Sequence, residues 1–237
     1  MGTLYIVGTP IGNLEDLTPR AARVLAQVSL VAAEDTRRTR QLLSHLGLSK
    51  PMLSVHADAE RGRANQIIEA LGRGDVALCT DAGMPSISDP GAHLVARVRD
   101  AGHGVAVVPG PSAVTAALAL SGLSADRFVF LGFLPRKSSE MTRAAEALAD
   151  ETRTAVAFES PYRLVKALDI IAAVLPQRSC AVARELTKVH EELRTGTAEE
   201  LADHYRSHPP RGEITILIEG APRRRAEKQR GRNREDE

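Results

Sequence analysis

The sequence of 237 residues predicts an α/β protein with two domains. In the first half, short apolar runs alternate with segments of helical periodicity, which is typical of an open, mostly parallel sheet. In the second half, strand-like segments follow one another without a helix between them, which favours a mixed sheet. A break at Ser121-Gly122 separates the halves. We therefore expect one domain over residues 1–122, a second over residues 123–220, and a cleft between them.

The elements of the first half follow from apolar runs and end signals. Thr18-Pro19 predicts a helix start, because threonine caps a helix and proline fits its first position. Gly72 predicts the end of another helix. The expected strands cover residues 4–8, 29–33, 52–55, 76–79 and 105–108, and the expected helices cover residues 19–26, 39–46, 63–71, 92–101 and 113–120.

The second half differs in composition, because its first expected strand contains three of the four phenylalanines. Residues 191–195 are expected to pair antiparallel with residues 180–183. The expected strands are 127–134, 154–158, 180–183, 191–195 and 212–219, and the expected helices are 139–149, 161–175 and 198–205. Residues 221–237 form a basic segment without an apolar pattern, which predicts a disordered tail. The tail is either an electrostatic arm for RNA phosphates or a solvated end.

Composition limits the function. The net charge is +1, so any contact with nucleic acid must come from local patches. Tryptophan is absent and aromatics make up 3%, which argues against base stacking as the main binding mode. Cys79 and Cys180 lie in apolar runs, which predicts buried thiols in a reducing compartment. The start of the chain does not resemble a signal peptide, and no apolar run is long enough to span a bilayer, so we expect a soluble cytoplasmic protein.

The loop of residues 80–91 is the strongest candidate site. It contains two glycines, two prolines and two aspartates, and it follows the buried strand 76–79. Open α/β sheets bind ligands at the carboxyl ends of their strands, and glycine lets the backbone approach a ligand closely. The alternative is a tight connection in which Asp89 or Ser88 caps the next helix and Pro90 takes its first position.

Other motifs are weaker. The first loop, residues 9–17, lacks the G-x-G-x-x-G pattern of dinucleotide-binding units. His204 and His208 have a spacing that fits metal ligands, but no third ligand is in view, so surface histidines are favoured and no metal site is expected. Nucleophile-elbow and P-loop patterns are also absent.

Six motifs together resemble one known family. The chain is similar to the 16S ribosomal RNA (cytidine 2′-O)-methyltransferases, a branch of the tetrapyrrole-methylase superfamily, over residues 3 to about 220. The motifs are Pro10-Ile11-Gly12-Asn13-Leu14, Glu34-Asp35-Thr36-Arg37, the run from Asp81 to Gly91, Pro109-Gly110-Pro111-Ser112-Ala113, Gly132-Phe133-Leu134-Pro135 and Arg184-Glu185-Leu186-Thr187-Lys188.

The resemblance implies a two-domain tetrapyrrole-methylase-like fold, that of a class III methyltransferase, with S-adenosylmethionine in the interdomain cleft. It further implies a homodimer that methylates the 2′-hydroxyl of a cytidine in the decoding region of 16S rRNA. Members commonly carry a further helical segment after the last strand, where this chain has its basic tail. The implied cofactor-binding residues are Pro10, Asp81, Ala82, Gly83, Met84, Pro85, Ser112, Ala113, Phe158, Glu159 and Leu186.

Two adjacent acids are candidates for the catalytic proton acceptor. Methyl transfer to a ribose hydroxyl needs the hydroxyl positioned and its proton removed. Glu34 and Asp35 end a buried strand, and burial of either would raise its pKa toward the useful range. Asp35 has a second interpretation as the N-cap of a helix that begins at Thr36.

Basic and amide side chains are candidates for the substrate side. Arg37, Arg38 and Arg40 either bind RNA phosphates or form a solvated helix face. Lys188 either orients the hydroxyl as a catalytic group or pairs with a neighbouring acid, Glu185 or Glu191. Asn13 either contacts a base or ribose or stabilises a turn.

Two other functions stay open. The same scaffold could methylate a tetrapyrrole or another small molecule, although the arginine-rich run from Arg37 to Arg40 favours a polyanion and the few aromatics argue against a porphyrin pocket. A non-catalytic ribosome assembly factor would rest on the basic tail. Binding of S-adenosylmethionine discriminates the enzymes from the assembly factor.

Overall fold

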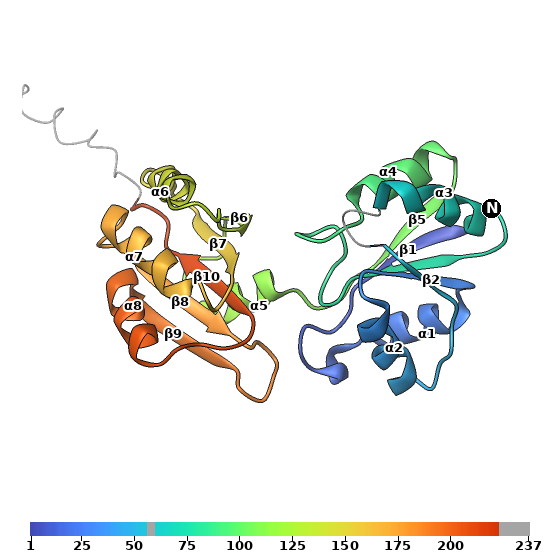
Figure 1. Ribbon diagram of the computed structural model, residues 1–237, viewed down its shortest axis with the longest axis horizontal. Coiled ribbons are helices and arrows are strands. Elements are labelled where there is room, and N and C mark those ends of the chain that lie inside the picture. The colour runs from blue at the N-terminus through green and yellow to red at the C-terminus, as the bar shows by residue number, and fades with distance from the viewer. Residues whose placement is uncertain (56–59, 223–237) are drawn as a thin grey trace, which may run out of the picture.

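The computed structural model describes residues 1–55 and 60–222, which form two lobes of α/β structure (Figure 1). Both expected sheets are present, and each has five strands. The prediction for the basic tail lies almost wholly outside the described residues.

The first lobe is a doubly wound parallel sheet with strand order β3-β2-β4-β1-β5. Helices α1 and α2 pack on one face, and α3 and α4 pack on the other (Figure 1). The strands are β1 Thr3–Val7, β2 Leu30–Ala33, β3 Met52–Ser54, β4 Val76–Cys79 and β5 Gly104–Val108, and the helices are α1 Pro19–Gln27, α2 Thr36–His45, α3 Glu60–Leu71 and α4 Ala92–Asp100.

The second lobe is a mixed sheet with strand order β6-β7-β10-β8-β9. Strands β6 and β7 pair parallel, whereas β10 pairs antiparallel with β7 and β8. Strand β8 pairs antiparallel with β9, which confirms the expected hairpin. Helices α6, α7 and α8 cover one face. The strands are β6 Phe128–Phe133, β7 Thr154–Glu159, β8 Ser179–Arg184, β9 Glu192–Thr197 and β10 Ile214–Ile218, and the helices are α6 Ser138–Glu146, α7 Leu164–Val174 and α8 Ala198–Ser207.

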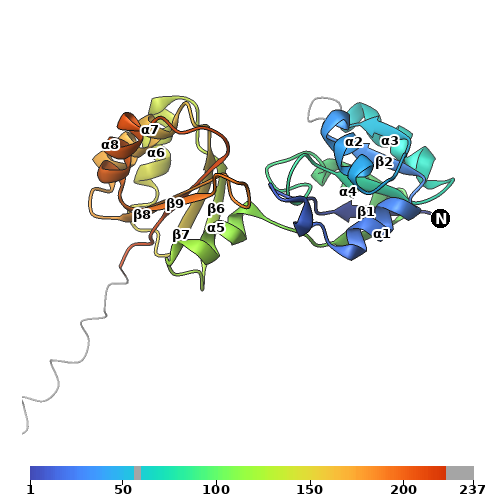
Figure 2. The same cartoon turned by 90° about the horizontal axis from the view of Figure 1, so that it is seen from below.

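Helix α5, Ala113–Ser121, covers the other face of the second sheet, which corrects the expected hinge at Ser121-Gly122. Its buried side chains Val114, Ala117 and Leu118 share a core with β7, β8 and β10. The chain therefore crosses between the lobes before α5, in the connection after β5 (Figures 1 and 2). The left-handed Gly122 ends the helix, as glycine often does, and marks no domain boundary.

Two predicted helix starts had different outcomes. Thr18 caps α1 by accepting a hydrogen bond from the Ala21 N–H at 3.1 Å, with Pro19 in the first turn, as expected. The predicted cap of α4 was wrong. Gly91, with φ of +138°, precedes Ala92 at the start of the helix, so neither Ser88 nor Asp89 caps it.

Both thiols are buried and free, as expected, and burial raises the pKa of Cys79 and of Cys180 to about 12. Among the helices that the structure describes, none is long and apolar enough to cross a membrane.

Candidate functional site

A cavity of about 370 Å³ lies between the two lobes, and we call it the interlobe cavity. Its size fits a small-molecule or cofactor site. It is lined by the ends of β2 and β4 in the first lobe, by the start of α5, and by β6, β7 and β10 with their loops in the second lobe. This is the edge of the parallel sheet at which open α/β folds bind ligands.

Most of the residues implied as cofactor-binding line this cavity. They are Asp81, Ala82, Gly83, Met84, Ser112, Ala113, Phe158, Glu159 and Leu186. Pro10 lines a second cavity next to it, and Pro85 lines neither. The structure therefore brings together loops that lie far apart in the sequence.

The loop after β4 is held as a rigid corner. The Thr9 N–H donates to the Gly83 carbonyl at 2.9 Å, and the Gly83 N–H returns a bond of 3.1 Å to Thr9. Gly83, Ser86 and Ser88 all have positive φ angles, of 80°, 73° and 62°. Asp89, near the end of this path, lines the cavity.

Three carboxylates gather on the first-lobe side of the interlobe cavity: Glu34, Asp81 and Asp89. Glu34 Oε2 accepts a bond of 3.3 Å from the Asp81 N–H, and Arg38 Nε lies 3.5 Å from Asp81 Oδ2. Burial raises the pKa of Glu34. Burial, with the nearby charges of Glu34 and Asp81, raises the pKa of Asp89 to about 6.

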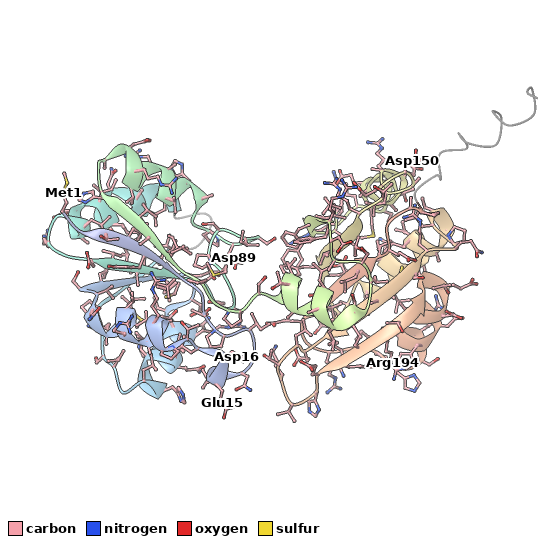
Figure 3. All side chains as sticks on the ribbon, turned by 180° about the vertical axis from the view of Figure 1, so that it is seen from behind. Met1, Glu15, Asp16, Asp89, Asp150 and Arg194 are labelled. Carbon is pink, nitrogen blue, oxygen red and sulfur yellow. The ribbon has the colours of Figure 1, made fainter. Side chains whose placement is uncertain are left out.

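Asp89 is a site residue that the sequence analysis missed, because it was assigned to the helix cap. Figure 3 shows it on the side of the first lobe that faces the second. The available signal was its place in a loop of glycine, proline and serine after a buried strand, at the sheet edge where open α/β folds bind ligands.

The raised pKa of Asp89 predicts that the stability of the folded protein depends on pH. Its folded pKa lies above the unfolded value of 3.8, so the native state binds the proton more tightly. Stability from this group is fully present below the unfolded pKa and is lost as pH rises through about 6. Asp89→Asn should flatten this part of the profile. Thermal unfolding of both proteins between pH 4 and pH 7.5 measures it, and parallel profiles would contradict the prediction.

Asp35 and Arg37 take structural positions outside both cavities. Asp35 Oδ1 caps α2 by accepting from the Arg37 N–H at 2.8 Å, and its Oδ2 pairs with Arg37 Nη2 at 2.8 Å. These bonds lower the pKa of Asp35 to about 2, so it is a poor proton acceptor. The capping interpretation of Asp35 therefore describes the structure, and the catalytic one loses its support. Arg40 also lines neither cavity.

Lys188 lines the second cavity and is held by two acids. Its Nζ lies 2.8 Å from Glu185 Oε1 and 3.0 Å from Glu213 Oε2. Pairing with Glu185 matches one of the expected alternatives, whereas Glu191 instead accepts from the Thr187 N–H at 2.6 Å.

Asn13 lines neither cavity. Its side chain caps the short 3₁₀ helix Leu14–Asp16 by accepting from the Glu15 N–H at 3.0 Å. The turn interpretation of Asn13 therefore describes the structure.

Glu159 offers the clearest sign of a ligand. Its side chain is fully buried, and Oε1 accepts from the Ser160 N–H at 2.6 Å and pairs with Arg163 Nη2 at 2.5 Å. Within the described residues Oε2 has no hydrogen-bond partner, although Glu159 lines the interlobe cavity. Buried carboxylate oxygens are normally satisfied, so this atom fits a ligand that brings a donor.

The rest of the wall is apolar. Phe133 and Phe158 pack edge to face with ring centroids 5.6 Å apart, and both line the interlobe cavity. In the described part of the chain, no group of three or more His, Cys, Asp or Glu side chains could hold a metal ion. An apolar wall with a few placed carboxylates suits an organic cation.

Comparison with known proteins identifies the protein family to which the chain belongs. The profile of the family described as Tetrapyrrole (Corrin/Porphyrin) Methylases matches residues 3–202, so the chain belongs to this family of S-adenosylmethionine-dependent methyltransferases. Solved structures show the same fold. Diphthine synthase has a TM-score of 0.71 at 13% identity, covering 92% of this chain and 90% of that one. Uroporphyrin-III-C-methyltransferase from Thermus thermophilus has 0.64 at 22% identity, covering 92% and 94%.

Sequence relatives narrow the class to one branch. The chain is 45% identical over 223 residues to a protein of Synechocystis sp., covering 93% of this chain and 80% of the relative. It is 46% identical over 221 residues to a protein of Thermotoga maritima, covering 93% and 99%. Both relatives are named ribosomal RNA small subunit methyltransferase I, and the expected resemblance is confirmed.

Proposed function

We propose that the chain transfers the methyl group of S-adenosylmethionine to the 2′-hydroxyl of a cytidine in the decoding region of 16S rRNA. The observation that carries the proposal is the interlobe cavity, which gathers nearly all the residues implied as cofactor-binding. The names of the relatives support the substrate class. A substrate in the small ribosomal subunit supports a cytoplasmic location for the enzyme.

The residues of the interlobe cavity fit the cofactor. S-adenosylmethionine supplies a methyl group on a cationic sulfonium. The carboxylates of Glu34, Asp81 and Asp89 favour a cation, and the partnerless Glu159 Oε2 accepts from an amino or hydroxyl group. Phe133 and Phe158 supply apolar surface for the adenine and the methionine chain.

We assign to Glu34 the role of general base, which accepts the proton of the ribose hydroxyl. This carboxylate lines the cavity beside Asp81, and burial raises its pKa toward the range of a general base. Bound S-adenosylmethionine would supply the methyl group to the hydroxyl oxygen and would become a neutral thioether, and Glu34 would accept the proton that the hydroxyl loses.

The chain would act as a homodimer. The edge strands β5 and β6 carry exposed apolar side chains, including Val107, Phe128 and Leu131, and unprotected apolar edges favour association. Sedimentation velocity of the protein at micromolar concentration measures the mass, and a monomer would contradict this part of the proposal.

Two experiments test the function in sequence. Calorimetry with S-adenosylmethionine should show binding, and no binding would leave the assembly-factor alternative. Labelled cofactor is then incubated with bare 16S rRNA, with small subunits and with tetrapyrrole precursors. Label on the ribose of a cytidine supports the proposal, whereas label on the tetrapyrrole alone would favour the small-molecule methylase.

A further inference from the structure

A second cavity, of about 380 Å³, lies beside the interlobe cavity. It is formed by the first loop, by one face of α2, by the end of β4 and by Lys188 and Glu213. The two cavities share Ile11, Arg38, Asp81, Ala82 and Glu213, which therefore form a common wall. A group bound in the second cavity would lie next to whatever is bound in the first.

The charged side chains that line the second cavity are paired with one another. Arg38 is paired with Asp81 at 3.5 Å, and Lys188 is paired with Glu213 at 3.0 Å. Cations that are already neutralised make a poor site for a phosphate. The remaining lining includes Pro10, Leu14 and Leu42, so the cavity suits a neutral, flat group with polar edges.

The position of helix α2 indicates how a nucleoside would be oriented in the second cavity. Arg38, Gln41 and Leu42 share one helix face and line the cavity, as their spacing allows. Arg37 and Arg40 lie on the exposed side of the helix, outside the cavity. Arg37 is already paired with Asp35 at 2.8 Å, so a nucleoside inside the cavity would leave its phosphates beside Arg40. Phosphates bound outside the pocket and a base read inside it are the division of contacts seen in nucleic-acid recognition.

Gln41 is suited to contact the base edge. Its side chain carries both an acceptor oxygen and a donor NH₂ group. When an enzyme takes a nucleotide out of the stack, it reads the edge of the base by hydrogen bonds. An amide can accept from the exocyclic amine of cytosine and donate to its ring nitrogen.

We propose that the second cavity receives the target nucleoside turned out of the RNA, with Gln41 as a specificity-determining contact to its base. The inference rests on the proposed function and deepens it. The ribose would lie at the common wall, with its hydroxyl directed at the methyl group in the interlobe cavity.

The test uses two variants of the full chain with matched controls. Gln41→Ala removes the proposed base contact, and Gln177→Ala removes an exposed glutamine distant in sequence that lines neither cavity. Leu14→Trp narrows the second cavity, and Leu120→Trp is its control, because the two leucines are 45% and 44% exposed. Methyl transfer to small subunits and the Kd of S-adenosylmethionine are measured for all.

We expect Gln41→Ala to raise the KM for subunits by about 5- to 150-fold, the range of one good base contact, with an unchanged cofactor Kd. It should also lose discrimination between subunits with cytidine and uridine at the target position. Leu14→Trp should raise the KM likewise, and both controls should match the wild type.

The contrary outcomes are distinct. Unchanged KM and discrimination in Gln41→Ala and Leu14→Trp, with an active wild type, would overturn the nucleoside pocket alone. A wild type that binds the cofactor but methylates no RNA would overturn the proposed function and this inference together.

Discussion

Replacing Glu34 with glutamine is expected to lower the rate of methyl transfer by about 100- to 10,000-fold, the usual contribution of a general base. Glutamine keeps the size of the side chain and its place in the interlobe cavity, but it cannot take the proton. Glu34 has the position for this role, because it lines the cavity and bonds to the backbone of Asp81 at the common wall. Single-turnover methylation of small subunits measures the chemical step.

The neighbouring residue provides the control. Asp35→Asn should transfer methyl at nearly the wild-type rate, because Asp35 lies outside both cavities and asparagine also caps helices well. The wild-type rate should rise with pH through the raised pKa of Glu34, since the carboxylate must be ionised to accept a proton. Equal losses in the two variants, or an active Glu34→Gln protein, would contradict the assignment.

This pair of acids shows where sequence reasoning reaches its limit. The end of a buried strand followed by a helix start was enough to select both residues. Only the backbone path beyond β2 decides that one side chain enters the cavity while the next caps α2. Two adjacent carboxylates with nearly the same sequence context thus differ in their contacts and in pKa.

The helices and strands could be predicted from the sequence more fully than the site residues. Apolar runs and cap signals such as Thr18-Pro19 are local, and the structure confirms the alternating first half and the mixed second sheet. The lobe to which α5 belongs could not be predicted from the sequence, because its small apolar side chains would suit either lobe. Packing against β7, β8 and β10 settles the choice, and this packing is a tertiary property.

The site shows the same division. The rigid loop after β4 was recognisable from its glycines and prolines, since these residues restrict or free the backbone locally. The common wall of the two cavities joins Arg38 and Asp81 of the first lobe to Glu213 of the second. No spacing along the chain predicts that meeting, because it depends on how two folded lobes face each other.

Gly8→Ala is expected to destabilise the protein by about 3 kcal/mol, the upper part of the usual range for overpacking, and to weaken cofactor binding by at least about tenfold. A Cβ at Gly8 would lie 2.7 Å from the Cα and N atoms of Gly110 and 2.7 Å from Met84 Sδ. The backbone of Gly110 cannot give way cheaply, so the strand ends of β1 and β5 must separate. The connection they hold leads to Ser112 and Ala113, which line the interlobe cavity with Met84.

A second glycine separates this clash from a general effect of adding a methyl group. Gly62 lies in α3, where a Cβ would have no described atom within 4 Å, and alanine is the better helix former. Gly62→Ala should therefore be neutral or stabilising by up to about 1 kcal/mol, with unchanged cofactor affinity. Urea unfolding and calorimetry with S-adenosylmethionine measure both variants. If Gly8→Ala matches Gly62→Ala in both measurements, the close approach of the β1 and β5 ends does not shape the cofactor site.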